Sequence, residues 1–141
     1  MRFLLFIFSI FLCQSVYSQD TITIKAKTAF ATDYIEGNTI SMIDLISNPE
    51  KYHGKRIQLI GFLNVEFEGT AIYFHQEDFD KSITKNGIWV SFDNKMYEKI
   101  NNEDLNQTYV ILAGTFNMKE KGHFGLWSGY IGQIYRLNKW N

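Results

Sequence analysis

The sequence predicts a mainly β fold in which five strands coil into a small closed barrel, with a short helix before the first strand. One observation is a long alternating run at residues 56–67 with Gly61 near its middle. The other is a set of four later apolar runs, at residues 70–75, 88–92, 109–116 and 124–137. Strands that coil until their ends meet leave no exposed edge, and five of them in Greek-key order make an OB-fold-like barrel.

The first 18 residues have the pattern of a secretory signal peptide. A positive start leads into a short apolar run at residues 3–13, and Val16 and Ser18 occupy the −3 and −1 positions of a cleavage site. The apolar run is shorter than the roughly 20 residues that span a bilayer. We therefore expect export, with a periplasmic or secreted product. Lipid anchoring at Cys13 is the weaker interpretation, because Leu12 stands where a lipobox has a small residue.

The rest of the chain is interpreted as one domain without a membrane span. An N-terminal strand and connection take residues 19–39, and the barrel domain takes residues 40–141. No cysteine follows Cys13, so packing must hold the fold without disulfides. Without residues 1–18, which carry one arginine and no acid, the formal net charge of −1 becomes −2. Nucleic-acid binders usually carry a basic excess, so this balance disfavours that class of partner.

The elements before the barrel are predicted to be short. Residues 21–25 alternate as a strand does, and residues 27–38 have no clear period and are interpreted as a connection. Ser41 can cap a helix that begins at Met42, and Pro49 cannot extend that helix. We expect the helix to cover one end of the barrel.

The first barrel strand is predicted over residues 56–67. Gly61 interrupts its apolar face, which indicates a bend or bulge where another backbone approaches. A tight turn at Glu68 and Gly69 leads into the second strand. The predicted apolar face consists of Ile57, Leu59, Leu63, Val65 and Phe67.

The later connections are polar. Residues 76–87 are predicted to form a loop with one helical turn, and residues 94–108 suit a short or irregular helix. The last strand is predicted over residues 124–137. Its glycines, which permit strong bending, are Gly125, Gly129 and Gly132.

Residues 45–61, LISNPEKYHGKRIQLIG, resemble the opening of small exported bacterial proteins with an OB-fold-like domain. The shared pattern is an Asn-Pro helix end, then Tyr-x-Gly-Lys, then an alternating strand that ends in glycine. Residues 114–116 and 122–125 match the same group again, and the resemblance covers about residues 41–137. It implies the fold and export. These proteins are uncharacterised, so no functional residue is carried over.

No catalytic constellation is recognisable in the sequence. His53, His75 and His123 are expected on separate loops or strand ends, and residues 75–78 are the only local group of possible metal ligands. A nucleophile elbow, a phosphate loop and a cysteine nucleophile are all missing after residue 18. We predict no enzyme, no cofactor and no metal. A metal-dependent enzyme that uses the His75 region is kept as the second alternative.

Aromatic side chains are the candidates for ligand binding. Tyr73, Trp89 and Trp127 lie opposite the more aliphatic sides of their predicted strands. Aromatics on the outer face of an OB barrel can stack on bases or sugars, so these three residues are the predicted binding platform. The alternative is that they fill the core of a small barrel.

Export, mild acidity and the missing catalytic groups together predict a non-enzymatic binding module. Its expected partner is an unknown envelope protein, a peptide or an envelope glycan, and the sequence leaves the oligomeric state open. Binding of single-stranded nucleic acid through the barrel face is the first alternative. It rests on the fold class alone.

Overall fold

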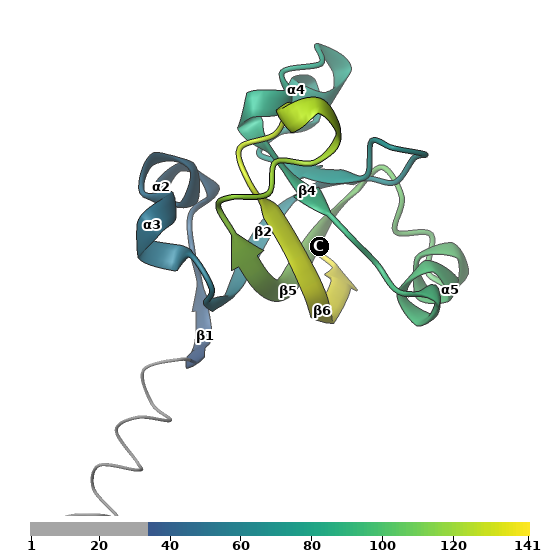
Figure 1. Cartoon of the computed structure of the whole chain (residues 1–141). Helices are drawn as coiled ribbons and strands as arrows, with labels where there is room; N and C mark the ends of the chain where they lie inside the picture. Colours follow the sequence, from purple (N-terminus) through teal and green to yellow (C-terminus); the bar gives the residue numbers. More distant parts are fainter. Residues whose placement is uncertain (1–33) are drawn as a thin grey trace, which may run out of the picture. The chain divides into compact units, whose positions relative to one another are not determined.

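A closed barrel of five strands forms the centre of the described structure (Figure 1). The computed structural model describes residues 34–141. The expected signal peptide, Cys13 and the strand predicted at residues 21–25 lie outside the described residues. The elements are β1 (Tyr34–Thr39), α2 (Met42–Ser47), α3 (Pro49–Tyr52), β2 (Arg56–Asn64), β3 (Ala71–Tyr73), α4 (Gln76–Asp80), the 3₁₀ turn η1 (Thr84–Asn86), β4 (Gly87–Val90), α5 (Asn94–Asn102), β5 (Thr108–Asn117), the 3₁₀ turn η2 (His123–Gly125) and β6 (Tyr130–Lys139).

The barrel has the strand order β2-β3-β4-β6-β5 and closes where β5 pairs with β2. Only the β4–β6 pair is parallel among these five strands, and the other pairs are antiparallel. This closed Greek-key arrangement is that of the OB-fold. The predicted fold class is therefore confirmed.

Strand β2 pairs with three strands, β1, β3 and β5, whereas each other barrel strand pairs with two. One edge of β2 pairs with β5 from Arg56 to Leu63. The other edge pairs with β1 in its first half and with β3 in its last residues. Gly61 lies just before the residues that pair with β3. A Cβ added to Gly61 would lie 2.5 Å from the carbonyl oxygen of Tyr73 and 2.7 Å from Cγ1 of Ile72. The close approach of a second backbone that the sequence predicts at Gly61 is therefore confirmed.

Strand β1 corrects the prediction that residues 27–38 are a connection. Residues Tyr34–Thr39 form a strand that runs parallel to β2, with Thr39 opposite Gln58. The segment lacks a two-residue period that sequence reasoning could detect. Backbone hydrogen bonding to the free edge of β2 stabilises it instead.

Helix α2 begins where the sequence predicts, because the Ser41 hydroxyl accepts a hydrogen bond from the Ile43 amide at 3.2 Å. Pro49 ends α2 and occupies the first turn of α3, where a missing amide hydrogen costs nothing. Asp44 joins the two helices. Its carboxylate accepts hydrogen bonds from Asn48 Nδ2 at 2.8 Å, from Lys51 Nζ at 2.9 Å and from the Tyr52 hydroxyl.

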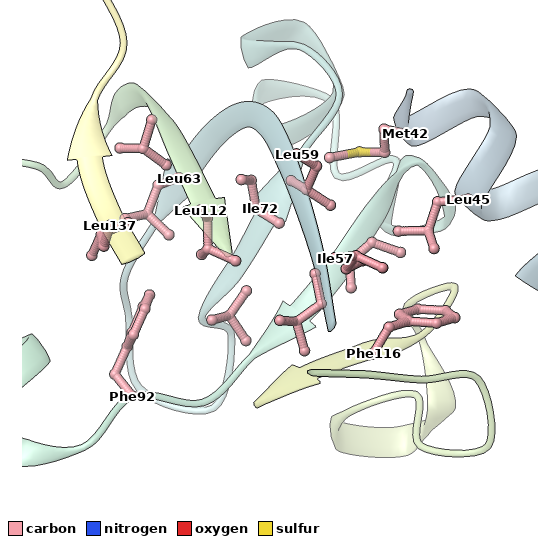
Figure 2. Packing of buried hydrophobic residues seen from close by; sticks show 14 of the residues in the cluster. Met42, Leu45, Ile57, Leu59, Leu63, Ile72, Phe92, Leu112, Phe116 and Leu137 are labelled. Carbon is pink, nitrogen blue, oxygen red and sulfur yellow. The ribbon is translucent and has the colours of Figure 1, made fainter. Parts of the chain in front are cut away.

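The main hydrophobic core runs through the barrel from α2 toward the start of α5. Figure 2 shows Met42 and Leu45 of α2 near Ile57 and Leu59 of β2 at one side of the cluster. Phe92, which precedes α5, lies near Leu137 at the other side. Helix α2 therefore covers one end of the barrel, as the sequence predicts. The connection of residues 94–108 contains a regular helix, α5, whose Ile100 is buried in the same core.

Four strands are shorter than the sequence predicts, and the difference is largest for β2, β3 and β6. Strand β2 ends at Asn64, because the Val65 amide donates a hydrogen bond to the side chain of Asn106 at 2.8 Å instead of pairing with a strand. Strand β6 begins at Tyr130, and η2 precedes it. Phe67 and Phe124 therefore lie in loops and not in strands.

Candidate functional site

The outer face of β2, β3 and β4 carries a second cluster of aromatic side chains, separate from the main core. Alternate residues of a strand point to opposite faces, so the neighbours of the core residues point outward here. Phe62, Ala71, Tyr73 and Trp127 are the buried members of this cluster, and Phe79 of α4 and Trp89 of β4 pack against it. This aromatic cluster lies on the face where OB-folds bind ligands.

The three residues predicted as a platform converge in this cluster. The rings of Trp89 and Trp127 lie 4.7 Å apart in a T-shaped arrangement, and Trp127 Nε1 donates a hydrogen bond to the Tyr73 hydroxyl at 3.3 Å. Only 3% of Tyr73 and 4% of Trp127 are exposed, and Trp89 is partly buried. An open stacking platform made by all three is therefore not formed.

The burial has a clear physical cause, which is that other segments cover this face. Phe79 comes from α4 and lies 5.9 Å from Phe62 and 5.7 Å from Tyr73, measured between ring centroids. Trp127 comes from the β5–β6 loop, residues 118–129, and not from the long strand that the sequence predicts. Burial is the main cause that raises the pKa of Tyr73, and the nearby Glu66 carboxylate also raises it, so the Tyr73 hydroxyl remains protonated.

Two loops border the aromatic cluster and approach each other at one side-chain contact. His123 Nε2 of the β5–β6 loop lies 3.7 Å from a carboxylate oxygen of Glu68 in the β2–β3 loop, residues 65–70. A phenylalanine is next in sequence to each partner. Phe67 is 91% exposed and Phe124 is 85% exposed. We call Phe67 and Phe124 the loop tips.

The β5–β6 loop is fixed to the body of the domain by several hydrogen bonds. Lys85 Nζ donates to the Gly125 carbonyl at 3.0 Å, the Thr84 hydroxyl donates to the Leu126 carbonyl at 3.1 Å, and the Ser128 hydroxyl donates to the Lys85 carbonyl at 2.6 Å. Figure 1 shows this loop, in lime green, next to α4. These hydrogen bonds order the backbone of the loop on which Phe124 is exposed.

Gly122 fits the β5–β6 loop against Trp89. Its φ of +65° is in the left-handed region that favours glycine, and an added Cβ would collide with the indole of Trp89. Phe124 also has a positive φ, of 55°. Because L side chains rarely adopt this conformation, the surrounding contacts must hold it, and it turns the ring outward.

One polar group on the same face has no partner. Asn64 is 2% exposed, and its Nδ2 has no hydrogen-bond partner in the described part of the chain. Asn64 lies opposite Ala71 on β3, so both residues share the outward face. No local signal in the sequence identifies Asn64 as a buried polar residue.

The histidines do not come together. His53 Nδ1 accepts a hydrogen bond from the Met118 amide at 3.3 Å, and the His75 ring lies tilted against Phe74 with 4.1 Å between ring centroids. Asp78, the buried carboxylate near His75, accepts hydrogen bonds from the His75 amide at 3.0 Å and from Asn86 Nδ2 at 2.8 Å. Within residues 34–141, no group of three or more His, Cys, Asp or Glu side chains could hold a metal ion.

Phe67 and Phe124 are the residues that sequence reasoning missed. Phe67 continues the apolar period of the first strand, so it was assigned to the buried face. The useful signal for Phe124 was the flanking pair Gly122 and Gly125, which both adopt positive φ and break the strand.

None of the helices in the described part of the chain is long and apolar enough to cross a membrane.

Comparisons with known proteins identify no relative of this chain. Searches against protein-family models, curated proteins and solved structures found no match to this chain.

Proposed function

We propose that this chain is an exported, non-enzymatic binding module that holds a polypeptide partner at its two loop tips. The observation that carries this proposal is the exposure of Phe67 and Phe124, at 91% and 85%, on two loops that meet beside the aromatic cluster. Exposed aromatic anchors that fill pockets on a partner are the usual centres of binding energy in protein interfaces.

The rigid setting of the loop tips supports this proposal. Burying a phenylalanine side chain is worth about 1.5–3 kcal/mol, and binding loses part of this when a loop must first be ordered. Trp127 and the hydrogen bonds from Thr84 and Lys85 already order the β5–β6 loop. The Thr70 hydroxyl orders the β2–β3 loop, because it accepts a hydrogen bond from the Glu66 amide and donates one to the Glu66 carbonyl. Little entropy is then lost on binding.

The charges near the loop tips favour a polypeptide over a nucleic acid. Glu66 and Glu68 flank Phe67 in sequence, and the other loop carries Lys119, Glu120 and Lys121, so the two loops hold three carboxylates and two ammonium groups. Carboxylates repel phosphates, and binding to nucleic acid depends on a cluster of cations. A polypeptide with an apolar pocket and a basic rim would complement this surface.

Site-specific photocrosslinking tests the proposal. The photoreactive residue benzoylphenylalanine replaces Phe67 or Phe124 in protein produced from the full-length chain, and the protein is mixed with envelope extract. We expect a discrete protein adduct from both positions that excess unlabelled protein abolishes.

Trp140 is the matched control, because it is an aromatic residue at 50% exposure outside the two loops. The same photoreactive residue at position 140 should give no such adduct. Equal adducts from all three positions, or none from Phe67 and Phe124, would show that the loop tips are not the binding site. If a single-stranded oligonucleotide prevents crosslinking at Phe67 and Phe124 at low salt but not at higher salt, the nucleic-acid alternative is favoured.

A further inference from the structure

A small cleft of about 240 Å³ lies between the end of β4, the start of α5 and the start of β6. Ser91, Asp93, Tyr130 and Gln133 supply its polar groups. It shares no residue with the loop tips. We propose that this cleft binds one neutral sugar residue of a glycan, which is a site separate from the polypeptide site proposed above.

Asp93 and Gln133 are held in place by hydrogen bonds, and these two residues and Ser91 are exposed, each with an atom available for a ligand. One carboxylate oxygen of Asp93 accepts a hydrogen bond from the Met96 amide at 2.8 Å and caps α5. The other carboxylate oxygen has no partner among residues 34–141. Gln133 Oε1 accepts the Thr115 hydroxyl at 2.9 Å, and its Nε2 remains unpartnered within the same residues. The Ser91 amide donates to the Ile131 carbonyl at 3.2 Å, while its hydroxyl bonds to no described residue.

The remaining lining of the cleft is apolar. Phe92, Met96 and Ile134 form it, and each is also in contact with the main core. Met96 and Ile134 are partly buried, and Phe92 is 8% exposed. The cleft therefore presents apolar side chains beside hydroxyl, carboxylate and amide groups.

This combination matches the chemistry of a sugar better than that of other small ligands. A sugar ring has apolar C–H groups for Met96 and Ile134, and it has hydroxyls that donate to Asp93 and accept from Gln133. A wholly apolar ligand would leave these polar groups desolvated and unpaired. The single carboxylate of Asp93 disfavours an anion, and one carboxylate is too few for a dedicated divalent metal site.

Gln133 offers a precise way to test the cleft. Its backbone has a φ of +50° next to a register shift between β5 and β6. Gln107 has nearly the same φ, +54°, is also exposed, and lies outside the cleft. Gln107→Ala is therefore a matched control for Gln133→Ala, because both variants place alanine at an exposed position with nearly the same positive φ.

The test is an NMR titration of ¹⁵N-labelled protein, produced from the full-length chain, with neutral methyl glycosides of glucose, galactose, mannose and N-acetylglucosamine. We expect saturable shifts of the Ser91, Asp93 and Gln133 amide signals with at least one glycoside. Gln133→Ala should weaken that affinity about fivefold, which is the effect of one neutral hydrogen bond, while Gln107→Ala should not change it.

Several outcomes would overturn the inference. These are no saturable shift at the three amides with any of the glycosides, or equal affinity in the Gln133→Ala and Gln107→Ala variants. Argininamide serves as a cationic probe of Asp93. Saturable binding of argininamide at these amides, in the place of the glycosides, would assign the cleft to a cation instead of a neutral sugar.

Discussion

Replacing Trp127 by alanine tests the packing of the candidate binding face most directly. Trp127 is 4% exposed, forms a T-shaped pair with Trp89 at 4.7 Å and donates a hydrogen bond to Tyr73 at 3.3 Å. Truncating a buried tryptophan to alanine costs about 3–5 kcal/mol. We expect a loss near the middle of this range, about 4 kcal/mol, which is a large share of the stability of an ordinary domain.

Trp127→Phe separates packing from hydrogen bonding. The smaller ring keeps much of the aromatic contact and loses the N–H donor to Tyr73. The net value of such a hydrogen bond is about 1 kcal/mol. We therefore expect a loss of about 1–2 kcal/mol, well below that of the alanine variant.

Urea unfolding followed by circular dichroism measures both variants. For a domain of this size, the slope m is about 2 kcal/mol per M, so a loss of 4 kcal/mol lowers the midpoint by about 2 M without changing m. The exciton signal of the Trp89–Trp127 pair should disappear in both variants, because each removes one indole. Phe124→Ala is the control in the same loop, and its exposed side chain should cost less than about 0.5 kcal/mol.

A loss below about 1 kcal/mol for Trp127→Ala would refute this description of the face. It would mean that the β5–β6 loop is not packed on β3 and β4. The outer face would then be accessible as an open aromatic surface, and Tyr73 and Trp89 of the predicted platform would be available to a ligand.

Three further predictions concern the barrel and its first helix. Gly61→Ala should cost about 1–3 kcal/mol in thermal unfolding, because its Cβ would lie 2.5 Å from a carbonyl oxygen of β3, and an unchanged Tm would contradict this close approach. Hydrogen bonds from Tyr52 and then from Lys51 lower the pKa of Asp44 below its ordinary value of 3.8. The ionised Asp44 carboxylate therefore stabilises the fold above pH 3.8, and this stabilisation is lost as the pH falls through the lowered pKa. Asp44→Asn should therefore flatten the acid limb of a pH–stability profile, and an unaltered limb would exclude this role. Asn64→Leu should be neutral or stabilising in urea unfolding because it removes an unpaired buried donor, whereas Asn106→Leu should destabilise because its side chain bonds both Val65 backbone groups.

The barrel could be predicted from the sequence because its determinants are local. Alternation in residues 56–63, the strand glycine Gly61 and the capping hydroxyl of Ser41 each act over a few residues, and each has the predicted role in the structure. Strand β1 could not be predicted. Its pairing depends on the free edge of β2, which is a tertiary feature.

The candidate site could be predicted only in part. The alternation rule identified the outward positions of Tyr73 and Trp89, and both lie in the aromatic cluster. Their burial depends on segments that come from elsewhere in the chain, namely α4 and the β5–β6 loop. Phe67 was assigned to the wrong side because an apolar period does not reveal where a strand ends. The side chain of Asn106, distant in sequence, takes the hydrogen bond that ends β2.

The self-covered face explains why binding would move to its margins. Phe79 and Trp127 occupy the surface that an OB barrel otherwise offers to a ligand, so a ligand would have to use groups outside it, such as the loop tips and the cleft beside β6. Trp127 then has two effects. It contributes stability to the domain, and it fixes the loop that carries Phe124. Loss of Trp127 should therefore weaken binding at the loop tips even though Trp127 touches no partner, whereas the cleft, which depends on α5 and β6, should keep its affinity.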